Sequence, residues 1–145
     1  MSLSVEKTVE DDFVKHLGSC HCGSVQFQVF ASENLTVFRC NCSICIKKQN
    51  NHFIIPSRYF SLLTGDDMLT TYTFNTHQAK HMFCKKCGVQ CFYRPRSNPD
   101  CYGIMPHCID SSTIKSIKYI DFDGVHWEQS IDDCAKKEKN PFDIK

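Results

Sequence analysis

The feature that most constrains this chain is the grouping of seven of its eleven cysteines into three tight clusters. The clusters are Cys20-His21-Cys22, Cys40-Asn41-Cys42-Ser43-Ile44-Cys45 and Cys84-Lys85-Lys86-Cys87. Disulfide scaffolds are usually shorter chains with an even number of cysteines, whereas this chain has 145 residues and an odd number. The pattern therefore favours reduced cysteines that bind metal ions.

The spacing within each cluster can direct two sulfurs to one point. In an extended segment, residues i and i+2 face the same way, so Cys20 and Cys22 are expected to present their sulfurs together. A tight turn does the same for Cys84 and Cys87. Gly88 can adopt a positive φ, which lets the backbone curl so that amide hydrogens approach the sulfurs. The segment from Cys84 to Gly88 is thus typical of a zinc knuckle.

Seven cysteine ligands divide into four and three. A structural zinc ion has four protein ligands, whereas a catalytic zinc ion has three and an open position. Two cysteine pairs far apart in the sequence make a closed site, and Cys40, Cys42 and Cys45 form a local triplet that lacks a fourth ligand. Two interpretations stay open, because a further side chain either closes the triplet or leaves it open for chemistry. The candidates for closing it are His52, His81 and Cys91.

The other cysteines lack the spacing of metal ligands, apart from Cys91, which comes four residues after Cys87. Cysteine is often a small buried hydrophobic residue. We therefore predict that four cysteines are not ligands: Cys91, Cys101, Cys108 and Cys134.

Hydrophobic residues between the clusters alternate with a period of two, which is typical of half-buried strands. The predicted strands are 25–29, 35–40, 58–64, 71–74, 80–84, 88–94 and 113–121. Short strands without intervening helices predict a mainly β, antiparallel domain. Trp127, Ile131 and Ala135 fit one short C-terminal helix. The residues 1–16 and 131–145 are polar or charged and are predicted to be tails around a domain of residues 17–130.

Charge and hydropathy exclude several classes of function. Seventeen basic residues against sixteen acidic ones give a net charge of +1, so the chain has no strong nucleic-acid signal. No apolar run approaches the roughly 20 residues of a membrane span, and the first residues lack a signal-peptide pattern. We expect no membrane partner and an intracellular location, cytoplasmic or nuclear, and leave a homo-oligomer open.

Several segments together resemble one protein family. They are GSCHCGSVQFQV, CNCSICIKKQNNHFI, TYTFNTH, FCKKCGVQCFYRPRSNP and GIMPHC. In them the sequence resembles the glutathione-dependent formaldehyde-activating enzyme family, and within it the centromere protein V-like branch, over about residues 17–130. The resemblance implies a zinc-stapled β-tent of small crossed sheets.

The resemblance also implies two zinc ions per chain. It assigns the structural zinc to Cys20, Cys22, Cys84 and Cys87. It assigns the catalytic zinc to Cys40, Cys42 and Cys45.

The activity that the resemblance implies is a carbon–sulfur lyase reaction, in which glutathione adds to formaldehyde to give S-(hydroxymethyl)glutathione. Three thiolates leave zinc with a charge of about −1, which makes it a poor activator of water and suits it to binding a further thiol. The basic residues that are candidates for contacting the glutathione carboxylates are Lys47, Lys48, Arg94 and Arg96. His52 is the candidate proton carrier. The alternative is a non-enzymatic zinc-stapled module that binds chromatin or microtubules.

Overall fold

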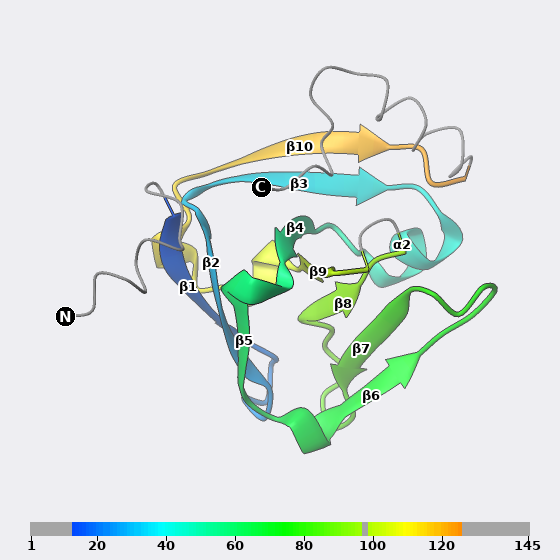
Figure 1. The fold of residues 1–145 in the computed structure, drawn as a ribbon, viewed down its shortest axis with the longest axis horizontal. Coiled ribbons are helices and arrows are strands. Elements are labelled where there is room, and N and C mark those ends of the chain that lie inside the picture. Colours follow the sequence, from blue (N-terminus) through cyan, green and yellow to red (C-terminus); the bar gives the residue numbers. More distant parts are fainter. Residues whose placement is uncertain (1–12, 97–98, 126–145) are drawn as a thin grey trace.

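The computed structural model describes residues 13–96 and 99–125, and their regular structure is mainly β, arranged in three small sheets (Figure 1). The prediction of a mainly β fold is confirmed. The short helix expected at residues 127–135 lies outside the described residues. Within the described part, the α-helix is α2 (Ser43–Lys48), which begins inside the second cysteine cluster where no helix was predicted. None of the described helices is long and apolar enough to cross a membrane.

The first sheet has three antiparallel strands in the order β1 (Phe13–Ser19), β2 (Gln26–Ser32) and β5 (Phe60–Thr64). Strand β2 alternates as predicted, because Phe27 and Val29 are buried while their neighbours are more exposed. Strand β1 begins at Phe13, inside the segment 1–16 expected to be a tail. Polar His16 can occupy the core there because its ring nitrogens lie 2.7 Å from Thr113 Oγ1 and 3.0 Å from the Ser32 carbonyl oxygen.

The second sheet has five antiparallel strands. Their order is β4 (Phe53–Pro56), β9 (Cys101–Ile104), β8 (Phe92–Arg94), β7 (Lys80–Cys84) and β6 (Leu69–Tyr72). Strand β7 has the predicted bounds. Strand β8 is shorter than the predicted 88–94, because the chain first completes the turn of the third cluster, where the Cys84 N–H donates to the Val89 carbonyl oxygen at 3.0 Å.

The third sheet pairs β3 (Asn34–Cys40) with β10 (Ser116–Phe122), and this pair is parallel, which departs from the antiparallel pairing predicted for the domain. A parallel pair needs a long crossover, which the five-stranded sheet supplies here. The register places Phe122 beside Cys40.

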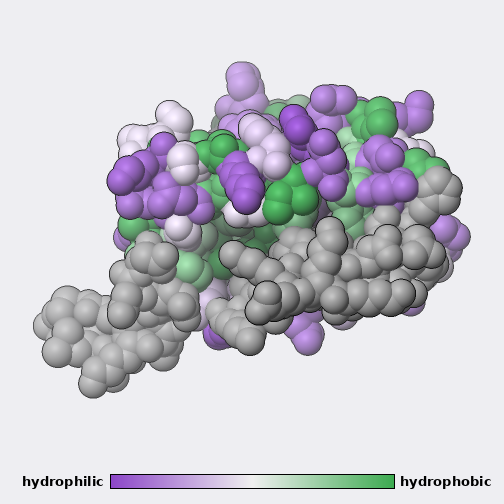
Figure 2. All heavy atoms as spheres, turned by 90° about the horizontal axis from the view of Figure 1, so that it is seen from above, coloured by the Kyte–Doolittle hydropathy of each residue, from purple (hydrophilic) through white to green (hydrophobic). Residues whose placement is uncertain are grey.

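Seen from above, where the undescribed residues do not cover the molecule, the surface has hydrophilic side chains mixed with hydrophobic ones (Figure 2).

Four short 3-10 helices complete the described structure, at Ser57–Tyr59, Asp66–Met68, Pro106–Cys108 and Ser111–Thr113. The core lies between the sheets. Phe27 of the three-stranded sheet and Phe92 of the five-stranded sheet meet edge to face with ring centroids 5.6 Å apart, and Phe60 packs 4.8 Å from Phe92. Such aromatic contacts tie the two sheets together.

Candidate metal centres

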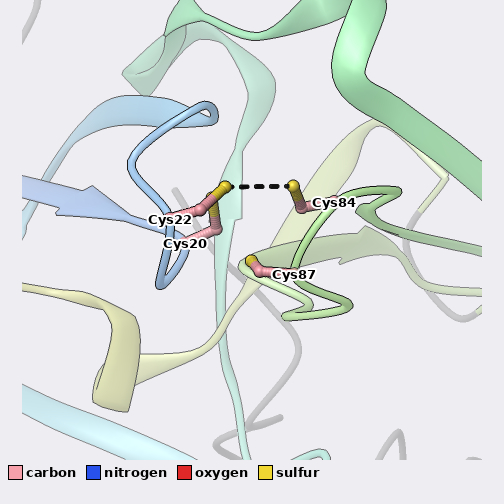
Figure 3. A group of neighbouring side chains, drawn as sticks. All are labelled: Cys20, Cys22, Cys84 and Cys87. Carbon is pink, nitrogen blue, oxygen red and sulfur yellow. Dashed lines mark hydrogen bonds between the residues drawn. The ribbon is translucent and has the colours of Figure 1, made fainter.

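Four cysteines of the first and third clusters come together between two sheets (Figure 3). Their sulfurs all lie within 4.8 Å of one another. The Cys22 sulfur is 3.6 Å from the Cys20 and Cys84 sulfurs. Four sulfurs around a tetrahedral zinc, each about 2.3 Å from the metal, are roughly 3.8 Å apart. We call Cys20, Cys22, Cys84 and Cys87 the four-cysteine cluster.

Two tight turns form this cluster, so Cys20 and Cys22 lie in a turn and not in the extended segment that was expected, because the Gly23 N–H donates to the Cys20 carbonyl oxygen at 3.3 Å. Cys20 and Cys22 follow β1, whereas Cys84 ends β7 and Cys87 lies in the next turn. Gly88 has φ 78°, as its place after Cys87 predicted, and its N–H donates to the Cys84 carbonyl oxygen at 2.8 Å. The Val25 N–H lies 3.3 Å from the Cys20 sulfur, so the backbone supplies a hydrogen bond that stabilises a thiolate.

The second group consists of Cys40, Cys42 and Cys45, whose sulfurs also lie within 4.8 Å of one another, and we call it the triplet. Cys40 ends β3, Cys42 precedes α2, and Cys45 lies in α2 and is buried. One helical turn places residues i and i+3 on the same side, which brings Cys42 and Cys45 together. The short helix that the strand pattern missed is therefore the element that shapes the triplet.

The pKa values of the three triplet thiols are shifted in different directions. Hydrogen bonds from the thiols of Cys40 and Cys45 lower the pKa of Cys42 to about 2. The hydrogen bond with Cys42 raises the pKa of Cys40 to about 11, and the same contacts with burial raise the pKa of Cys45 strongly. The shifts have opposite directions because each thiol that donates a hydrogen bond stabilises the thiolate of its neighbour, and metal binding to the triplet would release the remaining protons.

Asn50 makes two hydrogen bonds to Cys45 of the triplet. It is 1% exposed, and its Nδ2 donates to the Cys45 sulfur at 3.5 Å. Its backbone N–H donates to the Cys45 carbonyl oxygen at 2.8 Å. No sequence motif marked Asn50, because its contact with Cys45 depends on how the chain leaves α2.

The end of β10 closes the other side of the triplet. The Asn41 side chain lies 3.2 Å from Asp123 Oδ1 and accepts a hydrogen bond from the Val125 N–H at 3.0 Å. Gly124 is packed so closely that a Cβ there would collide with the Cys40 sulfur and lie 2.9 Å from Cys42 Cβ. This segment had no role in the sequence analysis, since only the β3–β10 pairing brings it to the triplet.

Neither histidine candidate joins the triplet among the described residues, because the ligand atoms that group within 4.8 Å are the three sulfurs. Both ring nitrogens of His52 have other contacts. Nδ1 lies 3.1 Å from the Asn50 carbonyl oxygen, and Nε2 lies 3.0 Å from the Tyr93 hydroxyl. Cys91, the third candidate, belongs to neither group.

The triplet opens onto a cavity of about 820 Å³. The triplet sulfurs share it with aromatic and polar side chains of the five-stranded sheet and its loops. Besides the cysteines, the main lining residues are Phe74, Asn75, His81, Tyr93, Arg96 and Val125. The four-cysteine cluster differs because it has four sulfurs, enough for a tetrahedral ion, although Cys20 also lines a second cavity of about 670 Å³.

The candidate basic residues occupy different places. Arg96 lines the cavity. Arg94 does not, because its guanidinium donates to Ser57 Oγ and the Tyr102 hydroxyl, each at 2.9 Å. Lys48 Nζ lies 4.7 Å above the Phe83 ring.

Three of the cysteines predicted not to be ligands are described, and none joins a metal-binding group there. Cys91 and Cys101 are buried and Cys108 is half-buried. The fourth, Cys134, lies outside the described residues.

The donor chemistry of both groups fits zinc. Each consists of sulfur atoms, which zinc prefers in structural sites, and the sulfur spacing in the four-cysteine cluster matches a tetrahedral ion. Backbone or side-chain N–H donors reach one sulfur in each group, as is typical of thiolate ligands. The chain therefore has two cysteine groups able to hold metal ions.

Comparison with known proteins gives two findings. A family model described as "Glutathione-dependent formaldehyde-activating enzyme" matches residues 15–120. A crystal structure of a Rhodobacter sphaeroides protein has a similar fold, with a TM-score of 0.59 and 29% sequence identity. That match covers 74% of this chain and 100% of the other.

Proposed function

Because the chain belongs to the glutathione-dependent formaldehyde-activating enzyme family, we propose that it is a zinc-dependent carbon–sulfur lyase that joins glutathione and formaldehyde. The product is S-(hydroxymethyl)glutathione. The sulfur–carbon bond forms, the π bond of the aldehyde breaks, and the proton released by the thiol ends on the aldehyde oxygen. The reaction needs no oxidant or reductant.

The two cysteine groups have different roles in this proposal. The four-cysteine cluster holds a structural ion, and the triplet holds the ion of the active site. When bound at the triplet, the metal supplies positive charge that favours ionisation of an incoming thiol. Asn50 orients Cys45, and the Gly124 segment holds Cys40 and Cys42 in place.

The observation that carries the proposal is that an incomplete set of three sulfurs opens onto a cavity of about 820 Å³. Cavities of roughly 300–1,000 Å³ are typical of small-molecule sites. Glutathione has a thiol and two carboxylates. The triplet suits the thiol, and the guanidinium of Arg96 in the lining suits a carboxylate.

A cobalt-substituted protein tests thiol binding directly. Zinc has no visible spectrum, whereas an added thiolate changes the charge-transfer absorption of cobalt. We expect glutathione to change this absorption, and S-methylglutathione, which has no ionisable thiol, to leave it unchanged. Cys42→Ser should abolish the change.

Catalysis needs a second measurement, because glutathione and formaldehyde also combine without help. NMR can follow, at equilibrium, the exchange between free formaldehyde and the formaldehyde bound as S-(hydroxymethyl)glutathione. Wild type and Cys42→Ser are compared at equal concentration. Wild type should exceed the background rate and Cys42→Ser should not. If wild type matches the background and glutathione leaves the cobalt spectrum unchanged, the non-enzymatic zinc-stapled module becomes the better account.

A further inference from the structure

Two cysteines outside the metal-binding groups lie together at one end of the paired strands β8 and β9. Cys91 immediately precedes β8, and Cys108 ends the 3-10 helix that follows β9. The Met105 N–H donates to the Cys91 carbonyl oxygen at 2.9 Å, and the Cys108 N–H donates to the Met105 carbonyl oxygen at 3.0 Å. The Cys108 thiol donates to the carbonyl oxygen of Gln90, the residue bonded to Cys91, at 3.6 Å. The backbone therefore holds the two cysteines as neighbours.

The thiols of Cys91 and Cys108 also interact with each other, and His107 adds a third group. The hydrogen bond with Cys91, together with the hydrogen bond and charge of His107, lowers the pKa of Cys108 to about 5 against the opposite effect of burial. The hydrogen bond with Cys108 raises the pKa of His107. A protonated imidazole beside a thiol favours the thiolate, which is the nucleophilic form of cysteine. Of the two thiols, Cys108 is the one with this imidazole next to it in the chain.

Cys108 and Cys91 differ in their access to solvent. Cys108 is half-buried and lines the second cavity of about 670 Å³, and the exposed His107 lines the same cavity. Cys91 is 2% exposed and is not part of this lining. A small reagent that enters the cavity therefore meets Cys108 first, and Cys91 lies behind it as a second thiol. This order is typical of a reactive cysteine with a resolving cysteine beside it.

We propose that Cys91 and Cys108 form a redox-active dithiol, which a small peroxide oxidises to a disulfide. The Cys108 thiolate attacks one oxygen of the peroxide, the O–O bond breaks, and hydroxide leaves with the other oxygen, which gives a sulfenic acid. The Cys91 sulfur then attacks the Cys108 sulfur, the S–O bond breaks, and water leaves with the thiol proton. The two cysteines lose two electrons, and the peroxide gains them. Neither cysteine takes part in the proposed lyase reaction, so the dithiol is a separate reactive site.

The disulfide would close the segment 91–108, which contains β8 and β9, into a loop. This end of the two strands packs against β1, because Ile109 forms a bridge with Gly18 and the Asp110 N–H donates to the Leu17 carbonyl oxygen at 2.8 Å. A cross-link removes conformational entropy from the unfolded chain. We therefore expect oxidation to raise the melting temperature by about 5–10 °C.

Peptide mapping of the zinc-loaded protein tests the pair directly. The protein is reduced, loaded with zinc and treated with one equivalent of hydrogen peroxide, and its remaining thiols are alkylated after unfolding. Mass spectrometry should find one disulfide, between Cys91 and Cys108, and a chain mass lower by two hydrogens. The zinc content should stay constant, because both sulfurs lie outside the metal-binding groups.

Variants separate the roles of the two thiols. Cys108→Ser should slow the reaction with peroxide by about tenfold or more, because it removes the reactive thiolate. Cys91→Ser should react at nearly the wild-type rate but stop at the sulfenic acid, which a 1,3-dicarbonyl reagent traps on Cys108. Cys101→Ser is the matched control, since Cys101 is a buried cysteine of β9 outside both metal-binding groups and outside the second cavity. It should behave as wild type.

Several results would overturn the inference. They are full alkylation of Cys91 and Cys108 after peroxide treatment, loss of zinc in step with the loss of thiols, and equal peroxide rates in Cys108→Ser and wild type. If Cys91→Ser does not fold because a hydroxyl replaces a buried thiol, Cys91→Ala takes its place, and sulfenic acid trapped on a cysteine other than Cys108 overturns the inference. A cross-linked wild type that melts at the temperature of the reduced protein would overturn the stabilising effect of the disulfide.

Discussion

At the residue scale, Asn50 shows how one buried amide can set the properties of a sulfur ligand. Its Nδ2 donates to the Cys45 sulfur, while its Oδ1 is buried without a partner in the structure. An N–H aimed at sulfur stabilises the thiolate that binds metal, and loss of such outer partners typically weakens metal binding 10- to 100-fold. We therefore expect Asn50 to increase the metal affinity of the triplet without being a ligand.

Asn50→Leu should raise the zinc dissociation constant of the triplet by about 10- to 100-fold, because it removes the N–H donor and keeps a similar side-chain size. Competition with a chromophoric chelator measures this constant. The four-cysteine cluster should keep its affinity. Asn51→Leu is the matched control, since the Asn51 side chain is not involved in this contact. Equal affinities in wild type and Asn50→Leu would show that the hydrogen bond does not support the triplet.

At the element scale, the parallel pair of β3 and β10 brings the residues after β10, near the end of the described part, to the triplet. The Asn41 N–H donates to the Phe122 carbonyl oxygen at 3.2 Å, directly after the register pair of Cys40 and Phe122. Gly124 then passes beside the sulfurs with no room for a side chain. The strand pair and Gly124 therefore pack against the triplet, whose three cysteines are close together in the sequence. We call the strand pair with Gly124 the clamp.

Gly124→Ala should weaken metal binding at the triplet while the protein stays folded. The added methyl group meets the Cys40 sulfur, so the clamp must move, at a typical cost of about 1–3 kcal/mol. Cobalt titration should show a loss at one of two sites, with a nearly unchanged circular-dichroism spectrum. Tyr119→Phe in β10 is a suitable control, because Tyr119 is 46% exposed and does not line the triplet cavity. Normal cobalt binding by Gly124→Ala would contradict this view of the clamp.

The same elements show what could be predicted from the sequence. The cysteine groups could be predicted, because i, i+2 and i, i+3 spacings are local. Strand β7 and the positive φ of Gly88 followed from local patterns as well. Helix α2 was missed, because its six residues are too few for a helical period.

The remaining parts of the candidate site depend on long-range pairing. Gly124 reaches the triplet through a parallel strand pair, which alternation along one strand does not reveal. His81 and Tyr93 become neighbours because β7 and β8 pair in a register that places them opposite each other. No motif marks either one as a cavity residue. The sequence pattern thus identified the two cysteine groups, and the structure added the residues that surround them.

At the scale of the whole molecule, the two cysteine groups differ in how distant the parts of the fold are that they connect. The four-cysteine cluster joins residues 62 positions apart, Cys22 and Cys84, and so connects the three-stranded sheet to the five-stranded sheet. The triplet spans only the end of β3 and the start of α2. A bound ion in the first group holds two sheets together, whereas one in the second closes a short loop.

This difference predicts opposite outcomes for two equivalent substitutions. A structural zinc contributes on the order of 10 kcal/mol, which is comparable to the whole net stability of a domain. Cys84→Ser should therefore unfold or aggregate the protein. Cys42→Ser should lower the zinc content from about two ions per chain towards one and leave the circular-dichroism spectrum folded. Thermal unfolding and metal analysis of the two variants check both results. Normal melting of Cys84→Ser would disprove the structural role of the four-cysteine cluster, and unfolding of Cys42→Ser would show that the triplet also carries the fold.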